Sequence, residues 1–200
     1  RASPMHVGLI AAGVVLSGAA PALAQAPVPG AAPLAQPAIP VEISPPDESG
    51  RAAAYARRYR IPKDLALKII ETAKSERLDP DLGFRLIRVE SVFRTNARGP
   101  AGALGLTQLM PSTARGVDRS LRTEAEILEP SNNLRVGFRY LRRLIEKYDG
   151  NIRLGLLAYN RGETAVNRSL RAGRDPENGY SPKVLSAGGS RYEGPGVLRD

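Results

Sequence analysis

The stretch "RLIRVESVFR", Arg85–Arg94, decides the fold. Leu86, Val89 and Phe93 recur at three- and four-residue spacing, which predicts one apolar face of an α-helix. Glu90 lies on that same face, four residues after Leu86. A carboxyl group removed from water has a raised pKa, and such a group can act as a general acid near neutral pH. The pattern therefore predicts a helix that carries a candidate catalytic acid.

Helix geometry alone leaves a second interpretation of Glu90 open. A half-buried glutamate can also be purely structural, with its charge balanced by Arg94 one turn later or by Arg85. On helix geometry alone, this structural role is the better interpretation, and the sequence that follows changes the balance.

The rest of the chain from about Asp47 onward also predicts helices. Asp79 is an expected N-cap, followed by Pro80 at the first helical position, and Asn151 is an expected N-cap further on. Strand-like alternation is almost absent, so we expect an all-α fold. We assign residues 47–186 to one helical domain and expect the glycine-rich residues 187–200 to form a disordered tail.

The beginning of the sequence predicts export. An uncharged apolar run, Val7–Leu16, precedes the A-x-A cleavage pattern Ala22-Leu23-Ala24, so residues 1–24 are interpreted as a signal peptide. Residues 25–46 are rich in proline and alanine and predict a flexible linker. We therefore expect a periplasmic protein cleaved after Ala24. Because no cysteine follows, we expect no stable membrane anchor after cleavage.

Composition excludes several kinds of chemistry. The 200 residues contain no cysteine and a single histidine, His6, so thiol nucleophiles, disulfides, a Ser-His-Asp triad and a histidine zinc site are unavailable to the domain. We expect no cofactor and no metal. The net charge of +9 favours a polyanionic partner, namely nucleic acid, an anionic membrane or an acidic cell-wall polymer.

A glycine-rich segment follows the predicted helix. In "GPAGALGLTQLMPSTA", Gly99–Ala114, the glycines allow close backbone approach. Gln108 offers both donors and acceptors, and Met110 is a flexible apolar group. We expect this loop to fold back over the helix and form one wall of a cleft.

Three motifs together resemble a known family. Glu90-Ser91, then "GALGLTQLMPSTA", then Ala158-Tyr159-Asn160 followed by Gly162, occur in the order and at the separations found in the transglycosylase domain of soluble lytic murein transglycosylases. The resemblance covers roughly residues 63–186. It implies a lysozyme-like, mainly α-helical fold.

The same resemblance implies an activity. The family cleaves the bond between N-acetylmuramic acid and N-acetylglucosamine in peptidoglycan without water and leaves a 1,6-anhydro sugar. Glu90 would be the single acid and base, first protonating the glycosidic oxygen and then taking a proton from the muramic 6-hydroxyl. The family uses the N-acetyl group of the substrate in place of a second carboxylate.

Other residue roles are implied in the same way. Tyr159 would point its hydroxyl toward Glu90, and Asn160 would brace its loop rather than touch substrate. Gln108 and Met110 would contact the sugar strand. Glu177, in "PENGYSPKVL", matches an acidic position that precedes a tyrosine, here Tyr180.

Two positions depart from the family pattern. Gly99 stands where many members have a serine that is thought to hydrogen-bond the catalytic carboxyl, although Ser91 lies next to Glu90. Thr107 stands where many have methionine, which would alter one wall of the cleft. These departures leave the tuning of Glu90 open.

A second catalytic carboxylate is not evident. The acidic residues of the region lie in polar stretches and are interpreted as solvated surface: Asp118, Glu124, Glu126, Glu129 and Glu163. This weighs mildly against a lysozyme-type hydrolase, which is the first alternative. The second alternative is a weakly catalytic peptidoglycan-binding module of a secretion or conjugation apparatus. The third, a nucleic-acid binder, conflicts with the export signal.

Overall fold

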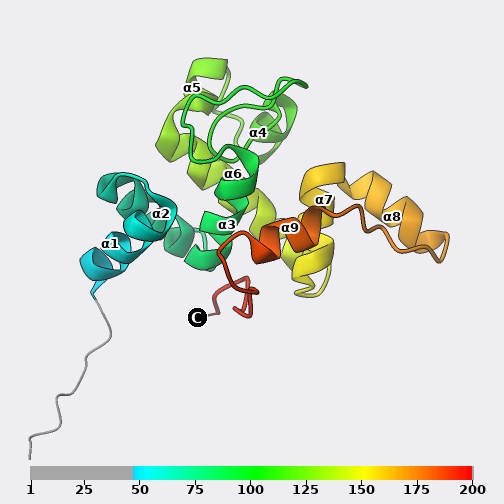
Figure 1. Cartoon of the computed structure of the whole chain (residues 1–200). Coiled ribbons are helices and arrows are strands. Elements are labelled where there is room, and N and C mark those ends of the chain that lie inside the picture. The colour runs from blue at the N-terminus through cyan, green and yellow to red at the C-terminus, as the bar shows by residue number, and fades with distance from the viewer. Residues whose placement is uncertain (1–46, 200) are drawn as a thin grey trace, which may run out of the picture. The chain divides into compact units, whose positions relative to one another are not determined.

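The computed structural model describes residues 47–199, which form an all-helical domain with no β-strand in that range (Figure 1). The predicted signal peptide and linker lie outside the described residues. The helices are α1 (Glu48–Tyr59), α2 (Lys63–Ser75), α3 (Pro80–Glu90), α4 (Pro111–Val117), α5 (Glu124–Leu128), α6 (Pro130–Lys147), α7 (Ile152–Arg161), α8 (Glu163–Arg171) and α9 (Tyr180–Ser186).

Helix α3 is the centre of the domain and lies between α1–α2 and α7–α9 in Figure 1. Its start follows the sequence, because the Asp79 carboxylate accepts a hydrogen bond from the backbone N–H of Asp81 and Pro80 occupies the first turn. Leu82, Phe84, Leu86 and Ile87 of this helix are all fully buried. A helix buried on most of its surface fixes the position of whatever stands at its end.

Helix α6 is the longest element and packs against α7 at very short range. A Cβ atom placed on Gly155 of α7 would lie 2.6 Å from Ile145 Cγ1 and 3.0 Å from its Cα, so only glycine permits this approach. Asn151 caps the start of α7 as expected, since its side chain accepts from the N–H of Leu154 at 3.0 Å. The close packing holds Tyr159 at the end of α7 in a fixed position.

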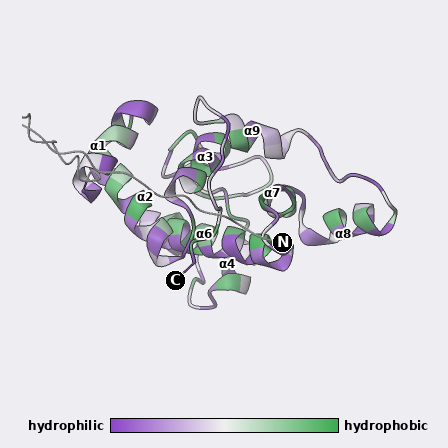
Figure 2. Ribbon diagram, turned by 90° about the horizontal axis from the view of Figure 1, so that it is seen from below, coloured by the Kyte–Doolittle hydropathy of each residue, from purple (hydrophilic) through white to green (hydrophobic). Residues whose placement is uncertain are grey.

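The amphipathic helices bury their apolar sides in the core, and Figure 2 shows hydrophobic and hydrophilic residues interspersed along α2 and α8. The glycine-rich loop and α4, α5 and α6 enclose a smaller second core, formed by Leu104, Leu109, Ala114, Leu121, Ile127 and Val136. Across residues 47–199, the helices are too short or too polar for any of them to traverse a lipid bilayer.

The prediction that Phe93 continues the helical face of Leu86 and Val89 is wrong. Helix α3 ends at Glu90, and both Val92 (φ 52°) and Phe93 (φ 61°) adopt left-handed backbone conformations. Phe93 is buried as predicted, but the turn rather than helical periodicity places it near Phe84, with ring centroids 6.2 Å apart. Tertiary burial of the ring overrides the local preference of the backbone.

The prediction of a disordered tail is also wrong for residues 187–199. The Tyr192 hydroxyl donates to Asp79 at 2.8 Å, and the Tyr192 ring lies beside the guanidinium of Arg85 at 5.4 Å. Arg85 is 2% exposed and donates to the carbonyls of Leu185 and Ser190. One aromatic side chain and one buried arginine therefore anchor a segment whose composition alone indicates disorder.

Candidate active site

Glu90 is the last residue of α3 and lies half-buried at the helix end. The chain turns away immediately, because Ser91 caps the helix and Val92 enters the left-handed region. Such a conformation costs roughly 1–3 kcal/mol for a β-branched residue and persists only where the surrounding structure enforces it. Here the turn leaves Glu90 at the helix end without a following turn of helix over it.

Tyr180 holds the Glu90 carboxyl group. Its hydroxyl donates a hydrogen bond to Glu90 Oε1 from the first residue of α9. Burial raises the pKa of Glu90, while the Tyr180 hydrogen bond and the positive charge of Lys183 oppose the increase. Burial and the neighbouring Glu90 raise the pKa of Tyr180, so it remains a donor. A carboxyl group with a raised pKa is suited to donate a proton near neutral pH.

Tyr159 does not bond Glu90, contrary to the expectation. Its hydroxyl donates instead to the carbonyl oxygen of Thr107 at 2.8 Å, and its ring packs against Tyr140. Burial is the main cause of the raised pKa of Tyr159. The nearby Glu90 carboxylate raises the pKa of Tyr159 further. It therefore ties the glycine-rich loop to α7, and the direct contact falls to Tyr180.

Gln108 folds back onto its own loop. Its Nε2 atom donates to the carbonyl of Gly105 at 2.9 Å and to that of Ala97 at 3.3 Å. A Cβ atom on Gly99 would lie 2.6 Å from Gln108 Oε1. The space next to Gly99 is thus occupied by the Gln108 amide, so a serine at that position would displace it. The absence of a side chain at Gly99 therefore allows the Gln108 side chain to fold inward.

A hollow of about 260 Å³ lies beside Tyr159, and Gln108, Met110 and Asn160 contribute to its lining. Met110 is 39% exposed and therefore available to a ligand. The side-chain oxygen Oδ1 of Asn160 accepts a hydrogen bond from the side-chain amide of Asn178, so Asn160 braces the segment before α9. The structure thus brings together, at the end of α7, four residues that the sequence singled out in two separate motifs.

Glu177 orients the segment that carries Tyr180. Its carboxylate accepts hydrogen bonds from the backbone N–H groups of Asn178 and Gly179, from the Ser181 hydroxyl and from Arg153. All its oxygens are engaged by the protein itself. Glu177 is therefore positioned to support α9 rather than to touch a ligand.

Ser91 and Thr107 also have structural contacts. Ser91 is 1% exposed and its hydroxyl donates back to the carbonyl of Ile87. Thr107 is fully buried, donates to Asn133 Oδ1 at 2.8 Å and is not part of the hollow's lining. The expectation that Thr107 changes a cleft wall is not supported, because its side chain faces α6, where Gly137 leaves room for it.

No second carboxylate influences the pKa of Glu90 among the residues that the structure describes. The acidic residues considered from the sequence have other partners: Asp118 with Arg135, Glu124 with Arg98, Glu126 with Thr123, Glu129 with Asn132 and Glu163 with Lys147. Residues 47–199 also contain no group of three or more acidic, histidine or cysteine residues placed to bind a metal.

Comparison with known families identifies the domain. The model of the transglycosylase SLT domain matches residues 67–180, which is more than half of the chain. The chain belongs to the transglycosylase SLT domain family. The match includes Glu90, the glycine-rich loop, Tyr159 and Tyr180, so the resemblance drawn from three short motifs is confirmed.

Individual SLT relatives are similar over part of the chain. The soluble lytic murein transglycosylase of Salmonella typhimurium is 32% identical over 90 residues, 42% of this chain and 14% of that protein. A transglycosylase of the Enterobacteria phage PRD1 is 32% identical over 90 residues, covering 45% of this chain and 32% of its own. The chain thus spans at most a third of the length of these relatives.

Solved structures confirm the fold. The lytic transglycosylase Slt of Pseudomonas aeruginosa, in an inactive variant, is 30% identical with a TM-score of 0.55, covering 60% of this chain and 22% of that one. The 70-kDa soluble lytic transglycosylase in complex with bulgecin A has a TM-score of 0.58 at 22% identity, over 76% of this chain and 29% of that one. The all-α, lysozyme-like prediction is therefore confirmed.

The sequence pointed to the acid and to the loop but missed the direct partner of the acid. Tyr180 was noted only as the tyrosine after Glu177, and its distance of 90 residues from Glu90 gives no local signal of contact. Lys183 was likewise missed, because one lysine on a short helix is indistinguishable from ordinary surface charge. Only the packing of α9 beside α3 brings these groups together.

Proposed function

We propose that this protein is a peptidoglycan lytic transglycosylase in which Glu90 is the single catalytic acid and base. The observation that carries the proposal is a half-buried carboxyl group with a raised pKa, held by Tyr180 inside a matched SLT domain. The hollow lined by Gln108, Met110 and Tyr159 lies in the same domain. The absence of a second carboxylate acting on Glu90 within residues 47–199 supports it further.

The proposed reaction has two proton transfers. Protonated Glu90 donates its proton to the oxygen that joins C1 of N-acetylmuramic acid to N-acetylglucosamine, and that C1–O bond breaks. The N-acetyl carbonyl of the muramic sugar stabilises the positive charge at C1. Ionised Glu90 then accepts the proton of the 6-hydroxyl as O6 bonds to C1, which gives the 1,6-anhydro product and restores the acid.

Tyr180 would hold the carboxyl group in place through both steps. Because its hydroxyl donates to Glu90 Oε1, it orients the carboxyl group and favours the ionised form needed for the second step. Burial favours the protonated form needed for the first step. The opposing influences suit a group that must exchange one proton in each direction.

The descriptions of two relatives support the proposed activity. The Pseudomonas structure is of an inactive variant in which one glutamate is replaced by glutamine. The Salmonella relative is described as a murein transglycosylase. By analogy, the substrate here would be peptidoglycan glycan strands, and the site of action the periplasm, as the predicted signal peptide indicates. Secretion-system or cell-wall assembly proteins are further candidate partners.

The test is the chemistry of the product. Purified sacculi are digested with the protein, and the released muropeptides are identified by mass spectrometry. We expect 1,6-anhydromuramyl ends. These ends are about 18 Da lighter than those of the hydrolysed sugar, because no water molecule is added. Reducing ends would indicate a lysozyme-type hydrolase instead. Binding to sacculi without release would favour the wall-binding module.

A further inference from the structure

A positive charge lies inside the core, on the same helix as the candidate catalytic acid. Arg85 of α3 precedes Glu90 by five residues and is only 2% exposed. Its Nε atom donates to the carboxylate of Asp81 at 2.7 Å, which balances the charge. A buried ion pair by itself often contributes little to stability, so the other contacts of Arg85 indicate its role.

The other contacts of Arg85 join α3 to α9. Its Nη1 atom donates to the carbonyl of Leu185 at 2.5 Å and to that of Ser190 at 2.6 Å. Leu185 lies in the last turn of α9, where carbonyl groups lack partners within the helix and attract a positive charge. Arg85 therefore attaches the C-terminal end of α9 to α3.

The same two helices are attached at a second point. At the other end of α9, the Tyr180 hydroxyl donates to Glu90 Oε1. On α3, Arg85 comes five residues before Glu90, and on α9 its partner Leu185 comes five residues after the tyrosine. Five residues of helix span about 7.5 Å, so the helices run antiparallel with two matched contacts. A shift of α9 that breaks the Arg85 contact therefore also moves the Tyr180 hydroxyl relative to the carboxyl group.

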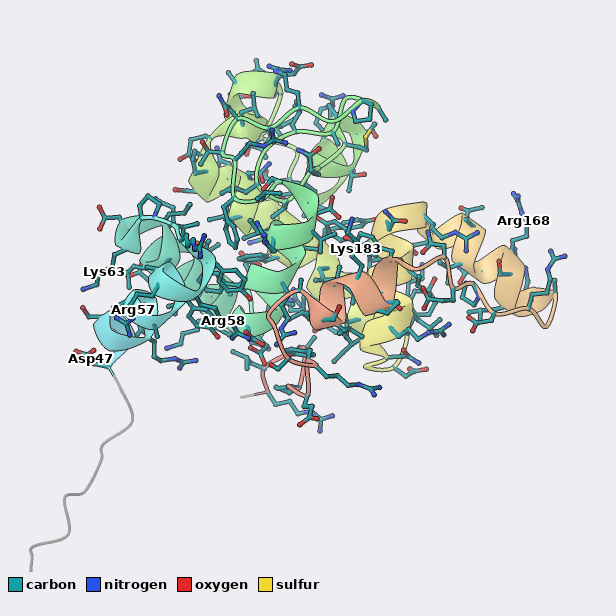
Figure 3. The ribbon with its side chains drawn as sticks, viewed as in Figure 1. Asp47, Arg57, Arg58, Lys63, Arg168 and Lys183 are labelled. Carbon is teal, nitrogen blue, oxygen red and sulfur yellow. The ribbon has the colours of Figure 1, made fainter. Side chains whose placement is uncertain are left out.

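The segment after α9 confines the guanidinium of Arg85. The Tyr192 ring lies beside it, with the guanidinium carbon 5.4 Å from the ring centroid. A Cβ atom on Gly188 would lie 2.7 Å from that same carbon, so an added side chain there must displace the guanidinium. Arg58, labelled on α1 in Figure 3, donates to the carbonyl of Gly188 and so holds the same segment. Arg85 is therefore fixed both by α9 and by the residues that follow it.

We propose that Arg85 is a positioning residue for the chemistry of Glu90, because it fixes α9 in the position that brings the Tyr180 hydroxyl to the Glu90 carboxyl group. Within residues 47–199, no hydrogen bond or ion pair joins Arg85 directly to Glu90, so it acts through Leu185 and α9. Its effect on catalysis rests on the proposed function. The contact between Tyr180 and Glu90 can be tested without any activity.

The readout is the pKa of Glu90, measured by NMR titration of isotope-labelled glutamate carboxyl carbons in the full chain. The Glu90 signal is the one that Glu90→Gln removes. Arg85→Met removes the guanidinium, whereas Gly188→Ala keeps every charge and displaces the guanidinium with the added Cβ atom. The matched control is Gly116→Ala on α4, where an added Cβ atom meets nothing within 4 Å.

We expect the pKa of Glu90 to rise in both test variants and to stay unchanged in the control. A hydrogen bond weakens steeply with distance and angle, so a small displacement of α9 removes the Tyr180 hydrogen bond that lowers this pKa. It also moves away the charge of Lys183, on α9 in Figure 3, which lowers the pKa as well. The tyrosine ring still covers the carboxyl group, and Tyr159 stays on α7. With sacculi, kcat should fall about threefold with little change in KM.

The double variant Tyr180→Phe, Arg85→Met separates positioning from a direct effect of the lost charge. In the Tyr180→Phe background, Arg85→Met should raise the pKa of Glu90 by about half as much or less, because the hydrogen bond that it disturbs is already gone. If Arg85→Met does not fold, Gly188→Ala is compared in the same two backgrounds.

An equal rise in both backgrounds would overturn the proposal, and so would a fall or no change of the Glu90 pKa in Gly188→Ala. The predicted pattern in a chain that releases no muropeptides from sacculi would reject only the proposed activity. It would leave Arg85 as the residue that sets the contact between Tyr180 and Glu90.

Discussion

Glu90 and Asn133 are two polar side chains that the fold removes from water, and the protein treats them differently. Asn133 is fully buried and its amide is saturated: its oxygen accepts from the backbone N–H and hydroxyl of Thr107, and its nitrogen donates to the carbonyls of Leu104 and Ile127. Glu90 is only half-buried, and the Tyr180 hydroxyl is its one side-chain hydrogen-bond partner within the described residues.

The difference separates a group that stabilises the fold from one that is available for chemistry. A buried amide with all its hydrogen bonds made locks the glycine-rich loop onto α6, because breaking any bond leaves a buried group unpaired. A carboxyl group with one partner keeps free lone pairs and a raised pKa. Activity should therefore depend on Glu90, and stability on Asn133.

The largest expected effect is on activity. Glu90→Gln should lower the rate of muropeptide release by about 10²–10⁴-fold, the usual range for loss of general acid–base catalysis. Glu124→Gln, at an exposed carboxylate paired with Arg98, is the control and should retain activity. Release by Glu90→Gln at the control rate would remove Glu90 from the mechanism.

The same variant has a signed effect on stability. Since burial raises the folded-state pKa of Glu90, the wild type loses stability as pH rises from about 4.5 through that pKa. Glu90→Gln should therefore be at least as stable as the wild type at pH 7, and any advantage should disappear below pH 4. Thermal unfolding at both pH values measures this.

The next effect is on stability. Asn133→Ala should cost about 2–4 kcal/mol of unfolding free energy, because it creates a cavity, leaves the Thr107 N–H without its acceptor and removes one donor from the carbonyls of Leu104 and Ile127. Asn132→Ala removes the neighbouring amide, which donates to the Glu126 carbonyl from a partly exposed position, and should cost less than about 1 kcal/mol. Urea denaturation distinguishes them, and equal losses would contradict the role given to Asn133.

The smallest effect sharpens the role of Tyr180. Tyr180→Phe should lower kcat about tenfold with little change in KM, because one hydrogen bond to the Glu90 carboxyl group is lost. That hydrogen bond lowers the pKa of Glu90, so its removal should raise the pKa. The high-pH limb of the kcat profile, where the acid loses its proton, should move to higher pH.

The control is Tyr148→Phe. It removes a hydroxyl at the C-terminal end of α6 that donates to Asn167 of α8. It should leave the limb in place. A limb that moves to lower pH in Tyr180→Phe, or does not move, would show that Tyr180 has only a packing role.

Much of the fold could be predicted because it depends on local signals. The Asp79 and Asn151 caps, the proline that opens α3 and the helical spacing of apolar residues act within a few residues, and all are found in the structure. The end of α3 could not be predicted, because burying the Phe93 ring outweighs the cost of two left-handed residues.

The candidate site divides in the same way. Glu90 could be found because a carboxyl group on an apolar face conflicts with its neighbours in the sequence itself. The partner of Glu90 could not be found, and Tyr159 was assigned a contact that Tyr180 makes. Tyr159 and Tyr180 are both far from Glu90 in sequence and near it in space. Their roles differ because the Tyr180 hydroxyl reaches the carboxylate of Glu90, whereas the Tyr159 hydroxyl reaches the carbonyl of Thr107.

The sequence by itself determined the helical class, the family and the acid, because periodicity, capping residues and motif spacing are properties of neighbouring residues. The tertiary structure alone decided which groups meet that acid. It placed α9 beside the end of α3 and filled the space at Gly99 with the Gln108 amide. Such contacts join residues tens of positions apart, and only the packing of the whole core sets their distances.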